Sequence, residues 1–144
     1  MLTVNIVCVG NLKESYLREA SDEYRKRLSR FCKCNVIECG ESNPEKEKLE
    51  ILKHLDGYVI ALCVEGDKIS SEKLASKIEN VAQTSSKITF VIGGSDGLAQ
   101  EVKDKADFRL SFSDMTFPHQ LMRIILLEQI YRAFTINNNI KYHK

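Results

Sequence analysis

The chain has 144 residues, of which 43% are hydrophobic and 28% are charged, and these proportions are typical of one ordinary globular domain. The 21 basic and 20 acidic residues leave a formal net charge of +1, so the overall charge does not by itself indicate a nucleic-acid binder. No apolar run approaches the ~20 residues of a membrane span, and the first residues lack the pattern of a secretory signal peptide. We therefore expect a single domain over residues 1–144 in the cytoplasm, without a membrane anchor.

Strand-like and helix-like segments alternate along the chain. In chain order, we predict a strand at Leu2–Val9, a helix at Lys13–Phe31, a strand at Asn35–Cys39, a helix at Pro44–Leu55, a strand at Tyr58–Val64, a helix at Ser70–Ala82, a strand at Ile88–Ile92, a helix at Leu98–Ala106, a strand at Phe108–Ser113 and a helix at Leu121–Ile136. Strands that are apolar on both faces and alternate with helices indicate a mainly parallel sheet covered by helices on both sides. The predicted fold class is α/β, with about five strands.

Five cysteines occur in the chain, and an odd number without a secretion signal favours reduced thiols. Cys32 and Cys34, with Cys39 nearby, have the spacing of half a metal site. The nearest histidine is the distant His54, and no second pair completes four ligands. We therefore predict no metal site and interpret the cysteines as buried or half-buried thiols.

Three loops follow apolar strands at the edge where parallel sheets bind ligands. They are the turn after Val64, the glycine-rich turn Gly93–Gly97 and the segment Phe112–Phe117. Glycines allow a close approach of the backbone to a ligand and a positive φ, although a plain tight turn also accounts for them. Neither the dinucleotide fingerprint nor the phosphate-loop pattern is present.

The last predicted helix begins beside Pro118, which suits the first turn of a helix, and is apolar almost all the way round. We expect such a helix to be buried on two sides, within a core or against a second chain. Its polar residues form two groups on different sides. They are His119, Gln120 and Arg123 near the start, and Glu128, Gln129 and Arg132 further along. A core helix with a locally satisfied Glu128–Arg132 pair is the alternative interpretation.

Several motifs along the chain together resemble one known family. They are Phe90–Leu98, Leu110–Gln120, Glu128–Ala133 and the terminal Tyr142-His143-Lys144, supported by Gly10–Lys13 and Glu23–Leu28. In sequence and spacing they are similar to the bacterial methyltransferases that modify N3 of a pseudouridine in 23S ribosomal RNA of the large subunit, a family of the SPOUT superfamily. The resemblance covers essentially the whole chain and rests on long, uncommon motifs.

The resemblance implies S-adenosylmethionine as cofactor, 23S ribosomal RNA in the assembled ribosome as substrate, a homodimer through the last helix and a C-terminal trefoil knot. Rules of chain topology alone would have rejected a knot. The implied cofactor-binding positions are Leu62, Gly93, Phe112, Ser113, Asp114, Met115, Thr116 and Phe117. The chain departs from the family at Asn137–Lys141, where the usual glycine is replaced, and around Asn43–Leu55, which is shorter. Asparagine tolerates a left-handed backbone, so we expect the turn there to survive.

The candidate catalytic residues are His119, Arg123, Arg132, Tyr142 and His143. A histidine is suited to accept the proton that the imide nitrogen of the substrate must lose, and an arginine to hold a phosphate or a developing negative charge. Tyr142 offers a ring that stacks on a base. Asp114 is expected to face the sulfonium of the cofactor, and the tail to fold over the cofactor as a flap. The plainer interpretations are a helix cap for His119 and a frayed terminus for the tail.

Two other functions remain open from the sequence. One is a flavodoxin-like nucleotide-binding domain, which predicts binding of phosphate-bearing cofactors at Gly93–Gly97. The other is a non-catalytic ribosome-binding module, which predicts RNA association without methyl transfer. A basic cluster has two interpretations, as a contact for RNA phosphates or as an ordinary solvated helix surface. The cluster is Arg25, Lys26, Arg27, Arg30 and Lys33.

Overall fold

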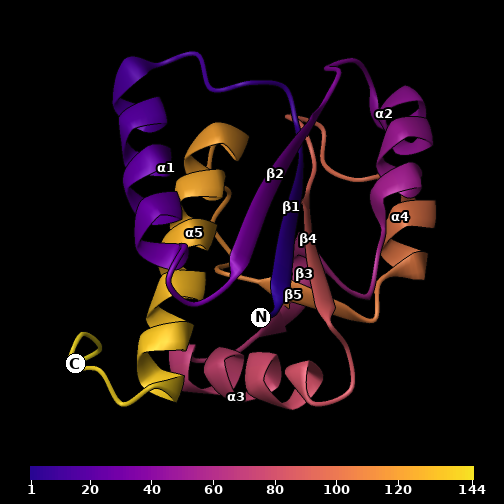
Figure 1. Cartoon of the computed structure of the whole chain (residues 1–144). Helices are drawn as coiled ribbons and strands as arrows, with labels where there is room; N and C mark the ends of the chain where they lie inside the picture. Colours follow the sequence, from indigo (N-terminus) through magenta and orange to yellow (C-terminus); the bar gives the residue numbers. More distant parts are fainter.

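The computed structural model describes all residues, 1–144, and its strands and helices follow the predicted order (Figure 1). The strands are β1 (Thr3–Val9), β2 (Lys33–Cys39), β3 (Tyr58–Lys68), β4 (Lys87–Ile92) and β5 (Phe108–Ser111). The helices are α1 (Ser15–Leu28), α2 (Pro44–Ile51), α3 (Ser71–Ala82), α4 (Gln100–Lys105) and α5 (His119–Asn137), with a short 3-10 turn, η1, at Leu52–His54. No helix has the length and apolar character required to cross a membrane.

All five strands pair in parallel in one sheet of order β2-β1-β4-β3-β5. Successive side chains of a strand point to opposite faces, so Ile6 and Phe90 belong to one core and Val7 and Val91 to the other. The first core is shared with α1, α3 and α5, and the second with α2 and α4. Figure 1 shows α1 and α5 on one side of the sheet and α2 and α4 on the other. The predicted α/β fold with both faces covered is confirmed.

Strand β3 is longer than the sequence pattern indicated. We expected it to end at Val64, but it continues to Lys68 and pairs with β5 again after a shift of register between Leu62 and Asp67. Gly66 permits this bulge, because a Cβ there would lie 2.8 Å from the backbone of Arg109. Bulges often redirect side chains beside a functional site, and this one turns residues 63–66 out of the ladder.

Helix α5 is buried along its length, as its apolar composition predicted. It packs on the sheet and against α1 and α3, and Leu126, Leu127 and Ile130 are fully buried. Leu121 remains 39% exposed and Ile125 is half-buried. The chain therefore buries most of α5 within its own core and leaves a smaller apolar surface near the start of the helix. The second chain and the knot that the resemblance implies stay predictions.

The end of α5 is closed by a left-handed asparagine. Asn139 has a φ of +56°, its N–H donates to the Ile136 carbonyl, and the Ile140 N–H donates to the Thr135 carbonyl at 2.9 Å. This pair of hydrogen bonds is the Schellman arrangement, which usually has glycine at the left-handed position. The expectation that asparagine preserves the turn at the replaced glycine is confirmed.

We predict that Asn139→Ala lowers the free energy of unfolding by about 1 kcal/mol, because alanine pays the full steric cost of the left-handed backbone. Asn139→Gly is the matched variant and is expected to be at least as stable as the unmodified chain. Urea denaturation followed by circular dichroism measures both. Equal stabilities for the two variants would contradict this account of the turn.

Candidate active site

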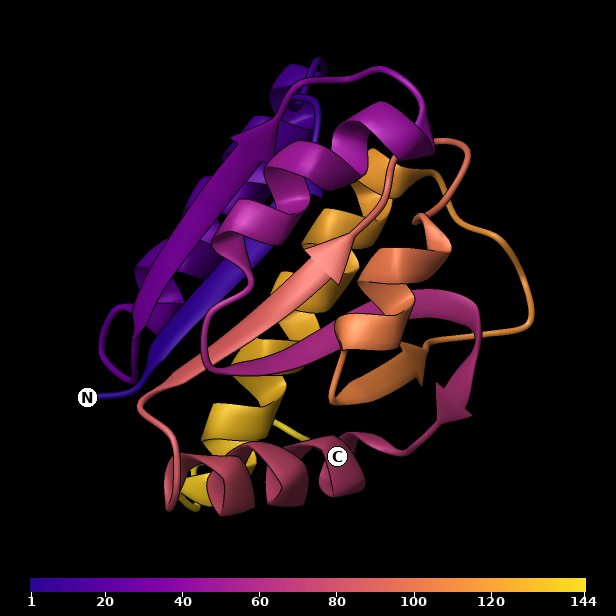
Figure 2. The same ribbon diagram turned by 90° about the vertical axis from the view of Figure 1, so that its right-hand side faces the viewer.

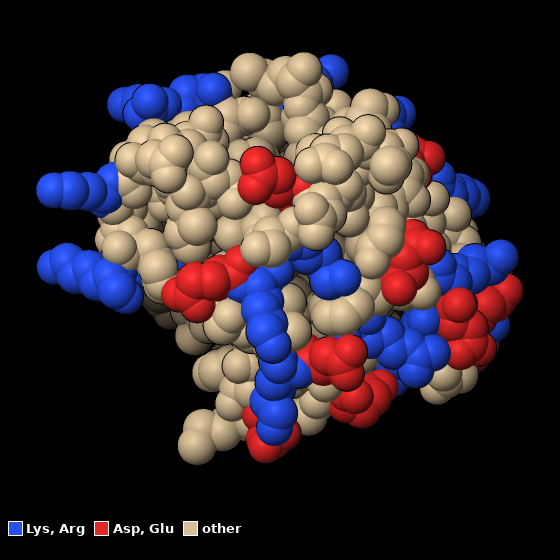
Figure 3. Space-filling view, turned by 90° about the horizontal axis from the view of Figure 1, so that it is seen from below, with Lys and Arg blue, Asp and Glu red and all other residues tan.

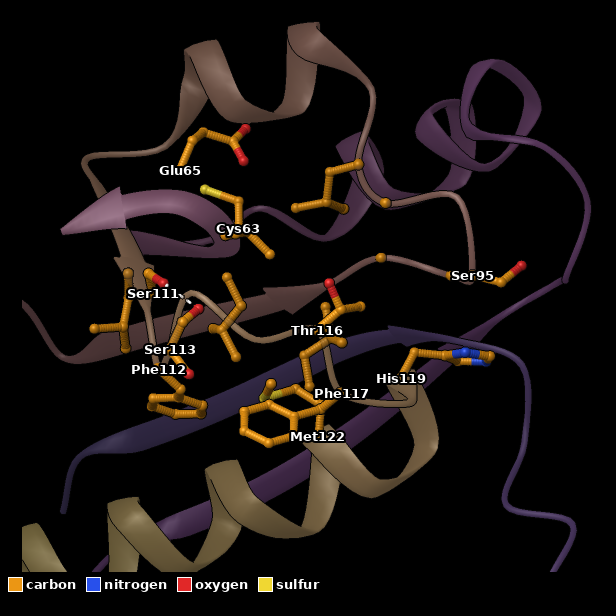
Figure 4. A pocket seen from close by; sticks show the side chains of 18 of the residues that line it. Cys63, Glu65, Ser95, Ser111, Phe112, Ser113, Thr116, Phe117, His119 and Met122 are labelled. Atoms are coloured by element: carbon orange, nitrogen blue, oxygen red, sulfur yellow. Dashed lines mark hydrogen bonds between the residues drawn. The ribbon is translucent and has the colours of Figure 1, made fainter. Parts of the chain in front are cut away.

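A cavity of about 750 Å³ lies at the carboxyl ends of β3, β4 and β5, beside the start of α5 (Figure 4). Its walls come from the three loops that the sequence singled out, and it includes Leu62, Gly93 and Thr116. Of the predicted cofactor positions, the residues that line it are Leu62, Gly93, Phe112, Ser113, Met115, Thr116 and Phe117. The predicted convergence of the three loops on one edge of the sheet is therefore found in the structure.

The glycine-rich turn after β4 is held by contacts within the turn itself. The Gly97 N–H donates to the Gly94 carbonyl at 3.0 Å, and Gly97 has a φ of +80°. A Cβ at Gly93 would lie 2.5 Å from the carbonyl carbon of Gly97. Gly93 is thus required by the closeness of the turn's own backbone, which agrees with the tight-turn explanation that the sequence left open beside the approach of a ligand.

The loop after β5 forms the opposite wall, and its shape depends on two serines. The Ser111 hydroxyl donates to the Ser113 carbonyl at 3.0 Å, and the Ser113 hydroxyl accepts from the Met115 N–H at 3.0 Å. Asp114 does not line the cavity; its carboxylate pairs with Lys68 at 2.6 Å and its side chain is 82% exposed. The loop turns Asp114 outward to Lys68, so this arrangement does not support the expectation that Asp114 faces the sulfonium of the cofactor.

His119 lines the cavity at the first position of α5. Its Nε2 atom is buried without a hydrogen-bond partner and lies 3.5 Å from the Glu41 carboxylate, which is 3.7 Å from the Lys13 ammonium. Figure 4 shows the ring directed away from Phe112, towards the side of the cavity where Ser95 lies. The N-cap residue of α5 is Pro118, and the Nε2 atom of His119 makes no hydrogen bond, so the helix-cap interpretation of His119 is not supported.

Arg123 is placed away from the cavity. Its side chain is 3% exposed and pairs with Glu38 at 2.6 Å, and it also donates to the Gly10 carbonyl at 3.0 Å. These contacts join α5 to the ends of β1 and β2. On α5 the Arg123 side chain faces the sheet and pairs with Glu38, so this arrangement does not support the expectation that Arg123 acts on substrate.

The remaining candidates form a separate cluster at the other end of α5, which we call the tail cluster: Glu128, Arg132, Tyr142 and His143. The Arg132 guanidinium pairs with Glu128 at 2.8 Å, and the Tyr142 hydroxyl donates to Glu128 at 3.0 Å. The Arg132 guanidinium also lies over the Tyr142 ring, 4.9 Å from its centroid. The tail is therefore packed rather than frayed. It does not cover the cavity of its own chain, so the expected flap is not observed within one subunit.

The hydrogen-bond partners of His143 indicate which of its ring nitrogens carries the hydrogen. Arg132 can only donate hydrogen bonds, so the His143 Nδ1 atom, 3.0 Å from it, is the acceptor. The Nε2 atom then carries the proton and donates to Glu72 on α3. Burial and the hydrogen bond to Glu128 raise the pKa of Tyr142 to about 12, so its hydroxyl keeps its proton near neutral pH. In this arrangement neither tail side chain has a free basic atom.

Glu65 and Lys103 are charged residues of the cavity that the sequence reasoning missed. They form an ion pair in its wall, and the hydrogen bond from Lys103 lowers the pKa of Glu65. Glu65 follows the apolar run of β3 directly, so its position was a usable signal. Lys103 belongs to α4, and nothing in the spacing of that helix indicated that it would meet β3.

The cysteines are free thiols. Burial raises the pKa of Cys8 and Cys32 to about 12 and that of Cys39 to about 11, so these thiols are unreactive near neutral pH. No group of three or more histidine, cysteine, aspartate or glutamate side chains is arranged to hold a metal ion. Cys63 alone among the five lines the cavity.

Comparison with known proteins identifies close relatives over the full length. A family model described as "Predicted SPOUT methyltransferase" matches residues 2–143. A relative from Bifidobacterium animalis subsp. lactis, named ribosomal RNA large subunit methyltransferase H, is 55% identical, with 99% of this chain and 100% of the relative aligned. A relative of the same name from Fusobacterium nucleatum subsp. nucleatum is 46% identical with the same coverage.

Solved structures with the same fold are more distant in sequence. A probable methylase family protein from Haemophilus influenzae Rd KW20 gives a TM-score of 0.59 at 16% identity, over 98% of this chain and 70% of that chain. The SpoU methyltransferase AviRb from Streptomyces viridochromogenes, in complex with the cofactor AdoMet, gives a TM-score of 0.50 at 10% identity, over 96% and 61%. At these identities the likeness is one of fold.

We predict that Gly93→Ala lowers the free energy of unfolding by about 3 kcal/mol, since the added methyl overlaps the backbone of Gly97 and forces the turn open. Gly40→Ala is the control, because its Cβ would have only a Glu50 carboxylate oxygen, 3.9 Å away, as a neighbour. Denaturation curves of both variants test this. A Gly93→Ala protein as stable as the control would mean that the turn relaxes freely.

Proposed function

This chain belongs to the SPOUT methyltransferase family, and from that premise we propose that it transfers a methyl group from S-adenosylmethionine to ribosomal RNA of the large subunit. The observation that carries the proposal is the meeting of three strand-end loops around one cavity in a chain that is 46–55% identical to large-subunit ribosomal RNA methyltransferases. N3 of a pseudouridine in 23S RNA, in the assembled ribosome, is the proposed target, and a cytoplasmic location is part of the proposal.

The residues of the cavity fit the proposed cofactor. Pockets of about 300–1,000 Å³ accommodate ligands of this size, and the volume here is about 750 Å³. Apolar side chains at Leu62, Leu98 and Phe117 suit a purine ring, while Glu65 and Lys103 offer opposite charges for the ends of an amino acid. We propose that the loops at Leu62, Gly93 and Phe112–Phe117 hold the cofactor, with Asp114 outside the contact set.

When bound, S-adenosylmethionine supplies a methyl group already activated on a positive sulfonium. The chain's own part is to align the attacking nitrogen and to receive its proton. Our candidate for the second is His119, which lines the cavity; its Nε2 atom makes no hydrogen bond within the chain, and Glu41 lies 3.5 Å away to stabilise a positive ring. A neutral imidazole in this position accepts the imide proton as the nitrogen attacks.

The tail cluster is too far from the cavity to serve the same substrate in one chain. Arg132 lies thirteen positions after His119 on α5, and a helix rises about 1.5 Å per residue, which gives about 20 Å. Figure 2 shows the loop that leads into α5 at one end of this helix and the chain terminus beside α3 at the other. If both groups act on one base, they must come from two subunits.

We propose a homodimer in which α5 packs against α5 of a second copy, so that the tail of each copy borders the cavity of the other. Exposed apolar side chains near the start of α5 support an interface there, since Met115 is 75% and Leu121 39% exposed. A twofold axis presents the same surface twice, and antiparallel helices place one copy's start beside the other copy's end. Tyr142 would then offer its ring to a base at the neighbouring cavity, with Arg132 and His143 holding it in position.

The alternatives left open by the sequence are separable from this proposal. A flavodoxin-like domain would bind phosphate-bearing cofactors, whereas membership of a methyltransferase family favours S-adenosylmethionine. A ribosome-binding module without activity would associate with ribosomes and transfer no methyl group. Tritiated methyl incorporation into ribosomes that lack the modification distinguishes such an inactive module from the proposed methyltransferase.

We predict that Thr116→Trp abolishes binding of S-adenosylmethionine, because the indole would fill the cavity that the exposed Thr116 side chain borders. Thr116 makes no side-chain hydrogen bond, so we expect the fold to be retained. Calorimetric titration measures binding, and Ser76→Trp on the exposed surface of α3 is the control. Binding as tight as in the control would remove this cavity from the proposal.

We predict that a mixture of two inactive variants regains activity. One is Thr116→Trp and the other lacks Tyr142–Lys144, and each homodimer has two defective composite sites. Random exchange of subunits after joint refolding makes about half of the dimers mixed, and each mixed dimer has one intact site of its two. About a quarter of the unmodified activity should therefore return. The measurement is tritiated methyl incorporation into unmodified ribosomes.

The outcomes of this mixing experiment differ for each model. Lack of recovery, with dimers present in sedimentation, would mean that tail and cavity act within one chain. Full activity of the tail-deleted protein alone would mean that the tail has no role and would leave His119 as the principal candidate.

A further inference from the structure

A groove runs between α1 and the edge strand β2, on the outside of the sheet. It consists of two adjoining hollows of about 670 and 420 Å³, which share Asp22 and Arg25. The wall that α1 forms carries Arg18, Arg25 and Lys26, whose spacing places them on one face of the helix. Because β2 has a strand neighbour on one side only, nothing in this chain covers the groove. We call it the α1–β2 groove.

The charge of the groove is positive and largely uncompensated. Its lining holds five cationic side chains and two carboxylates: Arg18, Arg25, Lys26, Lys33 and Arg123, with Asp22 and Glu38. Only Arg123 is neutralised, by Glu38 at 2.6 Å. Arg25, Lys26 and Lys33 are exposed and none of them forms an ion pair within 4.0 Å.

On the opposite face of the sheet, exposed unpaired lysines also occur, but two of the cations are held in ion pairs. Lys48 pairs with Glu45 and Glu101, and Lys103 pairs with Glu65. Figure 3 shows blue side chains projecting from the edge that carries α1 and the chain terminus, whereas red and blue are interleaved on the side of α2 and α4. A net charge of +1 therefore conceals an uneven distribution, and an unpaired basic surface is the electrostatic footprint of a polyanion partner.

The groove and the cavity open at the same edge of the sheet. One end of the groove reaches Leu12 in the loop after β1. In the same loop, Lys13 lies 3.7 Å from Glu41, which in turn lies 3.5 Å from His119 in the cavity. The seven residues of β2 extend the groove about 20 Å from that edge, a length sufficient for several phosphates of one strand.

We propose that the α1–β2 groove binds the phosphate backbone of the substrate RNA and leads the strand towards the cavity. This inference rests on the proposed function for the identity of the polyanion. Arg25, Lys26 and Lys33 contact phosphates, and Arg123 keeps the inner wall in place through Glu38 and the Gly10 carbonyl. Such contacts position the RNA without reading its sequence, so the target nucleotide is selected at the cavity.

The test is the triple variant Arg25→Gln, Lys26→Gln and Lys33→Gln, compared with Lys46→Gln, Lys53→Gln and Lys105→Gln. The control lysines are exposed, unpaired and on α2, η1 and α4. The probe is the assembled ribosome lacking the modification, bound at several salt concentrations. We expect about tenfold or greater loss of affinity in the first variant and a slope of log K against log salt smaller by about 2. The control should match the unmodified chain, and calorimetry should give an unchanged cofactor affinity for both.

Unchanged affinity and salt slope in the first variant would overturn the proposal. So would an equal loss in the control, which would indicate a general effect of charge. If the difference between the variants disappears with protein-free 23S RNA as the probe, the partner is an acidic protein surface and the proposal is wrong. If the unmodified chain binds the assembled ribosome but transfers no methyl group, the proposed function fails, and the binding comparison still decides the role of the groove.

Discussion

The buried ion pair between Arg123 and Glu38 determines where the last helix begins. A charge as buried as that of Arg123 must be paired and hydrogen-bonded to be tolerated, and its partners are the Glu38 carboxylate and the Gly10 carbonyl. Both lie where β1 and β2 end. The first turn of α5 is thereby held at the carboxyl edge of the sheet, and with it the loop that forms one wall of the cavity. The placement of His119 beside Glu41 follows from the same anchor.

The alternation of strands and helices could be predicted because the spacing of apolar residues depends directly on which side of each element is buried. The burial of α5 and the meeting of three loops at one edge were predictable for the same reason. The extension of β3 could not be, since its last residues pair with β5 only after a bulge that depends on Gly66. The partners of Asp114 and Arg123 are Lys68 and Glu38, which are 46 and 85 residues away, and no local pattern indicates such pairs. The glycine-rich turn was visible in the sequence, but the contact that requires glycine at position 93, with the backbone of Gly97, is visible only in the structure.

The candidate site residues fall into two groups that one chain holds apart, the cavity and the tail cluster. The cavity, with His119, Glu65 and Lys103, is complete within the chain. The tail cluster has its polar atoms occupied by Glu128, Arg132 and Glu72, so it offers a fixed surface more than a reactive group. A rigid surface of this kind costs little entropy when a substrate docks on it. Family resemblance identified these tail residues, and the contacts explain why they are held still.

The distance along the chain between α5 and its anchors has a consequence for synthesis. The contact of Arg123 with Gly10 joins residues 113 positions apart, and that of Gln120 with the Lys13 N–H joins residues 107 apart. Contacts so distant in sequence form late, because a long loop must close before they gain stability. During translation β1, α1 and β2 emerge first, and the face of the sheet that α5 later completes stays only partly covered. A nascent chain that stalls before α5 exposes this apolar face and becomes a substrate for chaperones or proteases.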